Sequence, residues 1–167
     1  MNETAEAGEL KTGLYRLHID GGKKASEAGG KALGAYGFVL SDPSGKEVAD
    51  ASQGKVLKEP VRDPHSAEYE GLLAGLELAR RLEIQYIAVF SDSRTLVNQV
   101  NGLWKSSSHL AEYCKHALGS LAGFKGWQVS WIPREWNQQA DLGVRKAFEG
   151  ATGAGSRGSV ATSGGFK

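Results

Sequence analysis

Four acidic residues have positions that could bring their carboxylates into one site. Asp20 follows an alternating segment, and Asp92 follows an apolar segment of strand length. Glu68 and Asp141 fall near the starts of two segments with helical periodicity. Carboxylates that lie close together repel one another, which raises their pKa values unless cations share the site. Hard oxygen ligands without thiolates or a histidine cluster favour Mg²⁺ or Mn²⁺, so the chemistry indicated is metal-assisted phosphodiester hydrolysis.

Each of these residues also has a purely structural interpretation. Asp20 precedes two glycines and could open a turn, and Asp92 could cap the helix that follows it. The positive end of a helix dipole could favour Glu68 and Asp141. Taken singly, the structural interpretation is favoured for every one of them. Periodicity alone does not show that the four carboxylates meet.

The elements that must position these residues begin with three strands. Residues 15–20 alternate between apolar and polar side chains, which is typical of a strand. A second strand is expected over 35–40 and a third in a long run that ends at Lys58, with a tight turn over 42–45 between them. Short connections predict that the three strands form an antiparallel meander. Asp20 is expected to end the first strand.

Helical periodicity begins after the third strand. Asp63 as the N-cap and Pro64 as the first helical residue predict a helix that carries Glu68 in its first turn. The remaining elements expected are a strand over 86–90, helices over 94–100 and 109–122, a strand over 127–132 and a helix over 138–148. This order predicts an α/β domain with a five-stranded mixed sheet, three antiparallel strands followed by two parallel ones, and helices on both faces.

Composition favours one globular domain in a reducing compartment. The 167 residues are 40% hydrophobic, which is ordinary for a soluble domain. We expect the domain over residues 13–150, between flexible tails at 1–12 and at the Gly/Ser-rich segment 151–167. The single cysteine, Cys114, excludes a disulfide or cysteine-zinc framework within one chain. With no signal peptide and no long apolar run, a cytoplasmic location without membrane contact is expected.

The balance of charge does not mark the chain as a nucleic-acid binder. The net charge is only +1, whereas many such proteins carry a strong positive excess. If the chain binds nucleic acid, its basic residues must cluster locally, or metal ions must supply part of the positive charge.

Four segments taken together resemble the ribonuclease HI family. They are Leu17–Gly21, Ala67–Leu72, Ser91–Ser93 and Pro133–Asp141, in the order and on the elements expected of that family. The match covers about residues 14–149, and Ser91–Lys105 is similar to the shorter bacterial and archaeal members. The resemblance implies a ribonuclease H-like fold and a monomer that cuts the RNA strand of RNA–DNA hybrids. It also implies a two-metal-ion mechanism, with Mg²⁺ or Mn²⁺ as cofactor, that leaves 5′-phosphate and 3′-hydroxyl ends.

The same resemblance assigns a role to each carboxylate. Asp20 would bridge both ions, Glu68 and Asp92 would complete one, and Asp141 would complete the other. Glu68 aligns with the residue that also contacts the ribose 2′-hydroxyl, a contact that distinguishes RNA from DNA. Glu70 competes with Glu68 for this assignment, but it lies about 200° around the helix from it.

Further residues are expected at the substrate. Arg134 would act through its charge, holding a phosphate or assisting product release, and the alternative is a solvated loop residue. The expected substrate contacts are Gly21, Gly22, His65, Trp104, Lys105 and Asn137. The alternative for His65 is an exposed residue of the first helical turn, and for Trp104 it is core packing. His18 is expected to pack under the site.

Three departures from the family leave a second interpretation open. The Gly-rich segment 23–33 lacks the usual Asn-Pro-Gly, Pro64 and His65 replace two asparagines, and residues 102–108 are too few for a basic protrusion. The chain could therefore be a hybrid-binding module that has lost efficient cleavage. Another nuclease or a transposase-type enzyme on the same fold is ranked last, because a fold does not fix a function.

Overall fold

Five strands form one mixed sheet in the computed structural model, which describes residues 12–25, 32–48 and 52–156. The strands are β1 Leu14–Lys24, β2 Leu33–Ser41, β3 Gln53–Val56, β4 Tyr86–Ser91 and β5 Gly126–Trp131. Their order across the sheet is β3-β2-β1-β4-β5. The pairs β1–β2 and β2–β3 are antiparallel, whereas β1–β4 and β4–β5 are parallel. The predicted sheet is confirmed.

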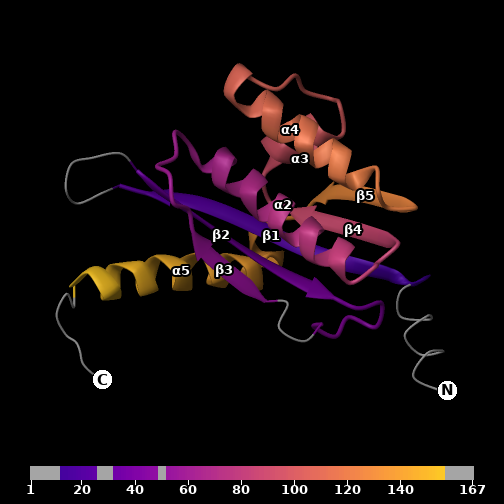
Figure 1. Ribbon diagram of the computed structural model, residues 1–167, viewed down its shortest axis with the longest axis horizontal. Helices are drawn as coiled ribbons and strands as arrows, with labels where there is room; N and C mark the ends of the chain where they lie inside the picture. The colour runs from indigo at the N-terminus through magenta and orange to yellow at the C-terminus, as the bar shows by residue number, and fades with distance from the viewer. Residues whose placement is uncertain (1–11, 26–31, 49–51, 157–167) are drawn as a thin grey trace.

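Helices cover both faces of this sheet. They are α2 Pro64–Arg81, α3 Arg94–Val100, α4 Ser108–Leu121 and α5 Gln138–Ser156, with a 3₁₀ turn η1 at Arg134–Trp136. Figure 1 shows α2, α3 and α4 together on one side of the sheet and α5 on the other. The glycines of β1 agree, since a Cβ on Gly21 would meet the backbone of α2, and one on Gly22 would meet Val144 of α5. Successive residues of a strand face opposite sides of its sheet.

The main core lies between the sheet and α2. Leu17 and Ile19 of β1 and Tyr69, Leu72 and Leu76 of α2 are fully buried. The start of α2 is fixed as predicted: Pro64 is its first residue, and the Asp63 side chain accepts a hydrogen bond from the Ser66 amide at 3.1 Å. His109 at the start of α4 contacts the other oxygen of Asp63. Asp63 therefore anchors the first turn of the helix that carries Glu68, both to its own backbone and to the start of α4.

Two strand predictions need correction. β1 does not end at Asp20 but continues to Lys24, because its antiparallel pairing with β2 continues to Lys24↔Leu33 after its pairing with β4 has stopped at Ile19↔Ser91. The third strand is not a long run but the four residues Gln53–Val56 at the sheet edge. Residues 49–51 of the predicted run lie outside the described part of the chain.

Two helix predictions also need correction. Glu68 is the fifth residue of α2 and so lies in its second turn rather than its first. The last helix ends at Ser156 instead of Phe148, within the segment predicted to be a flexible tail. Glycine disfavours a helix by only about 1 kcal/mol per residue, and an existing helix gains one hydrogen bond for each residue added. The predicted tail residues 1–11 and 157–167 lie outside the described residues.

The remaining predicted elements agree with the structure to within one residue at each end, except that β2 begins two residues earlier than predicted, at Leu33. In the described ranges, none of the helices combines the length and the apolar character that a membrane span requires.

Candidate metal centre

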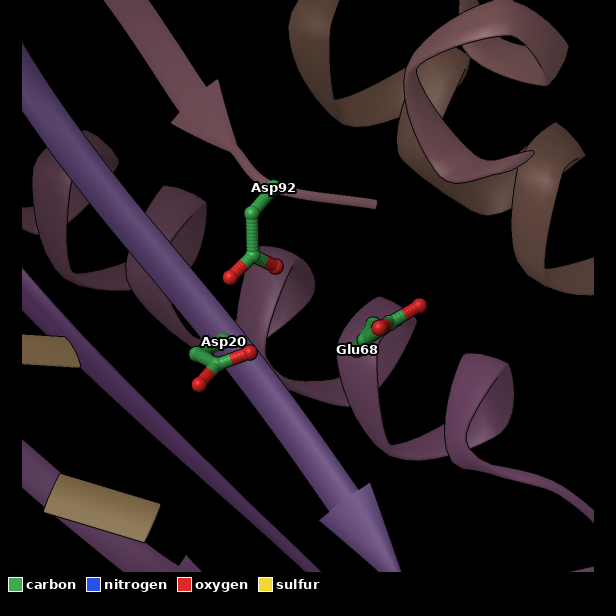
Figure 2. A group of neighbouring side chains, drawn as sticks. All are labelled: Asp20, Glu68 and Asp92. Atoms are coloured by element: carbon green, nitrogen blue, oxygen red, sulfur yellow. The ribbon is translucent and has the colours of Figure 1, made fainter. Parts of the chain in front are cut away.

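Three carboxylates from three different elements meet where β1 and β4 stop pairing. The last pair of these parallel strands is Ile19↔Ser91, so Asp20 and Asp92 are the next residues along the two adjacent strands. Glu68 comes from α2, which packs on the same part of β1. One carboxylate oxygen from each of the three residues lies within 4.8 Å of the other two. Figure 2 shows the three side chains gathered around one space.

Gly21 determines how close Glu68 comes to Asp20. A Cβ built on Gly21 would lie 2.4 Å from the Glu68 backbone nitrogen and 2.6 Å from the Ala67 carbonyl carbon. No side chain fits in that space, so β1 and the backbone of α2 are in direct contact here. This contact brings the carboxylate of Asp20, the residue before Gly21, close to the carboxylate of Glu68 on α2. Gly21 was predicted as a substrate contact, and the structure gives it this role in packing.

Burial and mutual repulsion make the cluster unfavourable for negative charge. Asp20 and Glu68 are only 7% and 8% exposed. Burial first, and the charge of Asp92 second, raise the pKa of Asp20 to about 8. Burial and then the charge of Glu68 raise the pKa of Asp92. A cation among the three oxygens would relieve both effects, and carboxylate oxygens are the ligands that hard divalent cations prefer.

Asp141 lies beside the cluster rather than within it. It lies in the first turn of α5, as predicted, and its Oδ2 is 3.2 Å from the Arg145 Nε one turn later. Its hydrogen bond and charge also contribute to the raised pKa of Asp20, so the two carboxyl groups are neighbours. Of the four predicted carboxylates, three thus lie close together. The fourth, Asp141, lies next to Asp20 and forms an ion pair with Arg145.

Two basic side chains border the carboxylates. The Arg134 Nε lies 3.9 Å from Asp92 Oδ2, and this side chain is 84% exposed, so its guanidinium remains open to a ligand. The His65 Nδ1 lies 3.0 Å from Glu68 Oε1, and that hydrogen bond raises the pKa of His65. His65 is therefore partnered with a carboxylate of the cluster instead of being a free residue of the helix start.

Asn137, predicted as a substrate contact, is buried beside the cluster. It is 1% exposed, and its Nδ2 donates a hydrogen bond of 2.7 Å to the backbone carbonyl of Ile19. A buried amide cannot reach a ligand at the surface. Its role is to join the start of α5 to β1 directly before Asp20.

Replacing Asn137 with Ala is expected to lower the free energy of unfolding by about 1–3 kcal/mol, because the buried Ile19 carbonyl loses its donor. Urea denaturation measures this effect. Its exposed neighbour offers a matched control, since Gln138→Ala should change stability by less than about 0.5 kcal/mol. Equal stability of the two variants would show that the hydrogen bond contributes nothing.

The other predicted contacts lie elsewhere. Trp104 and Lys105 are exposed in the segment between α3 and α4, so core packing does not explain Trp104, which is 51% exposed. Gly22 faces Val144 of α5. His18 packs as expected, stacking on Phe90 with 5.0 Å between ring centres, and burial lowers its pKa.

One pair beside the cluster was missed by the sequence analysis. The Arg94 guanidinium carbon lies 3.9 Å from the centre of the Trp131 ring, and the Trp131 Nε1 donates to the backbone carbonyl of Asp92 at 3.2 Å. Trp131 lies beside Asp92 because it pairs with Ser91 across parallel strands, and only the strand register could have indicated this. A predicted strand over 127–132 beside one over 86–90 does not fix that register.

Comparisons with known proteins point in one direction. Residues 21–147 match the family model described as reverse transcriptase-like. Ribonuclease HI of Halobacterium salinarum is 28% identical over 140 residues, which are 83% of this chain and 66% of that protein. The bifunctional protein Rv2228c of Mycobacterium tuberculosis is 35% identical over 136 residues, 81% of this chain and 35% of that protein. The chain therefore spans less than two thirds of the length of either relative.

Solved structures agree with these relatives. The crystal structure of RNase H1 from Halobacterium salinarum superposes with a TM-score of 0.72 at 29% identity, covering 83% of this chain and 99% of that one. The N-terminal RNase H domain of Rv2228c gives a TM-score of 0.75 at 27% identity, covering 86% of this chain and 99% of that one.

Proposed function

The chain belongs to the reverse transcriptase-like family as a ribonuclease HI-type member, and we propose that it is an endonuclease that hydrolyses the RNA strand of RNA–DNA hybrids. The observation that carries this proposal is the cluster of Asp20, Glu68 and Asp92, whose oxygens lie within 4.8 Å of one another. The similarity to a ribonuclease HI supports the same reaction. We expect residues 13–150 to form the active domain. We also expect the protein to be a monomer located in the cytoplasm.

The cluster is suited to a divalent cation, and we assign Mg²⁺ to it, with Mn²⁺ as a substitute. Asp20, Glu68 and Asp92 would hold one ion, and Asp20 with Asp141 would hold a second. Bound there, the ions would activate a water and stabilise the leaving oxygen, giving 5′-phosphate and 3′-hydroxyl ends.

The surrounding side chains would position the substrate. Glu68 would accept a hydrogen bond from the ribose 2′-hydroxyl, which selects RNA over DNA. Arg134 would hold a phosphate through its exposed guanidinium, since an arginine does not give up its proton near neutral pH. Asp141 would need to exchange its ion pair with Arg145 for the second ion.

A second candidate function is a hybrid-binding module with weak cleavage. It is favoured by the hydrogen bond between His65 and Glu68, which occupies one of the oxygens that a cation or a ribose would use. The complete set of four carboxylates argues against this candidate, because such a cluster costs stability unless cations accompany it.

A cleavage assay with and without metal should distinguish the endonuclease from the hybrid-binding module. A labelled RNA–DNA hybrid would be incubated with Mg²⁺, with Mn²⁺ or with chelator, beside single-stranded RNA, duplex RNA and duplex DNA. We expect cleavage of the RNA strand of the hybrid alone, and its loss in chelator. Hybrid binding without cleavage under either metal would leave the binding module in place of the enzyme, and equal cleavage of duplex RNA would refute the assigned substrate.

A further inference from the structure

A groove of about 460 Å³ opens beside the carboxylate cluster. Glu68 and Asp92 form part of its wall, and His65, Arg94, Trp131 and Arg134 are among the other residues that line it. The groove therefore joins the negative cluster to an aromatic surface and to basic groups. A strand that reaches the carboxylates can continue along it.

Arg94 is held in a defined orientation in this groove. Its guanidinium carbon lies 3.9 Å from the centre of the Trp131 ring, a distance typical of a cation–π contact. The Trp131 indole N–H donates to the Asp92 backbone carbonyl at 3.2 Å. The arginine, the indole and the backbone of a cluster carboxylate thus form one connected unit.

Apart from its contact with Trp131, Arg94 makes little contribution to the stability of the fold. It is the first residue of α3, where a positive charge opposes the helix dipole at a cost of about 0.3–1 kcal/mol. Within the described ranges, no carboxylate forms an ion pair with it. Arg94 is exposed, so the edge of its guanidinium is open to a ligand from solvent.

A planar guanidinium suits a phosphate, which it can bind through two parallel hydrogen bonds. The groove is walled by Asp92, one of the carboxylates assigned to the reaction, so the nearest strand is the one being cut. We propose that Arg94, stacked on Trp131, binds a phosphate of the cleaved strand adjacent to the scissile phosphate. This inference rests on the proposed function.

The salt dependence of hybrid binding tests the inference. Binding would be measured by fluorescence anisotropy with Mg²⁺ over a series of NaCl concentrations, in an Asp20→Asn background that prevents cleavage. Adding Arg94→Gln should weaken binding roughly 10-fold and reduce the slope of log K against log salt by about 0.9. Arg94→Lys should keep the slope and recover part of the affinity, because it keeps the charge without the planar fork.

Two further variants control for charge and for positioning. Lys115 is exposed on α4 and lines none of the grooves described, so Lys115→Gln removes one charge elsewhere and should leave affinity and slope unchanged. Trp131→Leu should reduce the additional loss caused by Arg94→Gln to about 2-fold or less. Arg94→Gln behaving like Lys115→Gln would overturn the inference.

A neutral linkage locates the contact. Hybrids would carry a single uncharged methylphosphonate at successive positions of the RNA strand and then of the DNA strand. At one RNA position next to the cleavage site, the substitution should weaken binding of the protein with Arg94 but not of the Arg94→Gln protein. Coupling only in the DNA strand, or at no position, would refute the assignment. Failure of the unaltered protein to cut any hybrid would instead refute the proposed function.

Discussion

Replacing Asp20 with Asn should lower the rate of hybrid cleavage by roughly 10³-fold or more at saturating Mg²⁺. A carboxylate oxygen of Asp20 lies within 4.8 Å of one from Glu68 and one from Asp92, and Asp141 also contributes to the raised pKa of Asp20, so Asp20 is the carboxylate common to both proposed ion sites. Asn keeps the shape of the side chain and removes its charge. Single-turnover cleavage of a labelled hybrid measures the effect.

Glu70→Gln is a matched control for this prediction. Glu70 lies two residues after Glu68 on α2, but its carboxylate accepts a hydrogen bond from the Tyr113 hydroxyl at 2.7 Å, outside the cluster. We expect its cleavage rate to stay within about 3-fold of the parent, since the amide oxygen can still accept that bond. A large loss here would mean that removing any carboxylate of α2 is damaging, and that the cluster has no special role.

Stability without metal distinguishes a lost function from a damaged fold. Because the pKa of Asp20 is raised to about 8, the folded chain retains a proton that the unfolded chain releases above about pH 4. The contribution of Asp20 to stability therefore falls as the pH rises through this interval. In chelator, Asp20→Asn and the parent should be nearly equal in stability at pH 4, and the advantage of Asp20→Asn should grow by roughly 1.4 kcal/mol per pH unit up to about pH 8. A variant that is less stable at pH 8 would contradict this sign.

Gly21→Ala should lower the free energy of unfolding by about 3 kcal/mol and reduce cleavage with it. The added methyl group would lie 2.4 Å from the Glu68 nitrogen and 2.6 Å from the Ala67 carbonyl carbon. Both are backbone atoms, so no side chain can rotate away, and β1 and α2 must separate. Urea denaturation and cleavage assays on the same preparation measure the two effects.

The same substitution at Gly119 should have the opposite sign. Gly119 lies within α4, and a Cβ there would meet nothing within 4 Å. Alanine favours a helix over glycine, so Gly119→Ala should stabilise the fold by about 0.5–1 kcal/mol and leave cleavage unchanged. If Gly21→Ala also stabilises the fold, the backbones of β1 and α2 do not lie in direct contact at Gly21.

Local signals in the sequence were sufficient to predict most of the fold. The alternation over 15–20, the Asp63-Pro64 helix start and the apolar run over 86–90 each depend on neighbours in the chain, and each element is where it was expected. The end of β1 could not be predicted in this way. Whether a strand continues past Asp20 depends on β2, which pairs with it as far as Lys24↔Leu33.

The candidate site needed more than local signals. Periodicity placed Asp20, Glu68 and Asp92 near the ends of elements, and only the resemblance to a family indicated that they meet. Asn137 is predicted as a substrate contact because a polar residue beside a carboxylate motif looks like one, whereas in the structure its amide donates to a buried carbonyl. The contact between Arg94 and Trp131 depends on strand register, which composition and spacing do not reveal.

The parallel pairing of β1 with β4 has a consequence for synthesis of the chain. Asp20 is made early, but it acquires its neighbour Asp92 only after the chain has extended through α2 and β4, because Ile19 pairs with Ser91. Parallel strands require such a crossover, and non-local pairing of this kind is slow to form. A nascent chain that has not reached β4 therefore has no site in which to bind a cation. Divalent cations should bind the completed fold alone, and by mass action they stabilise it over every incomplete or unfolded form.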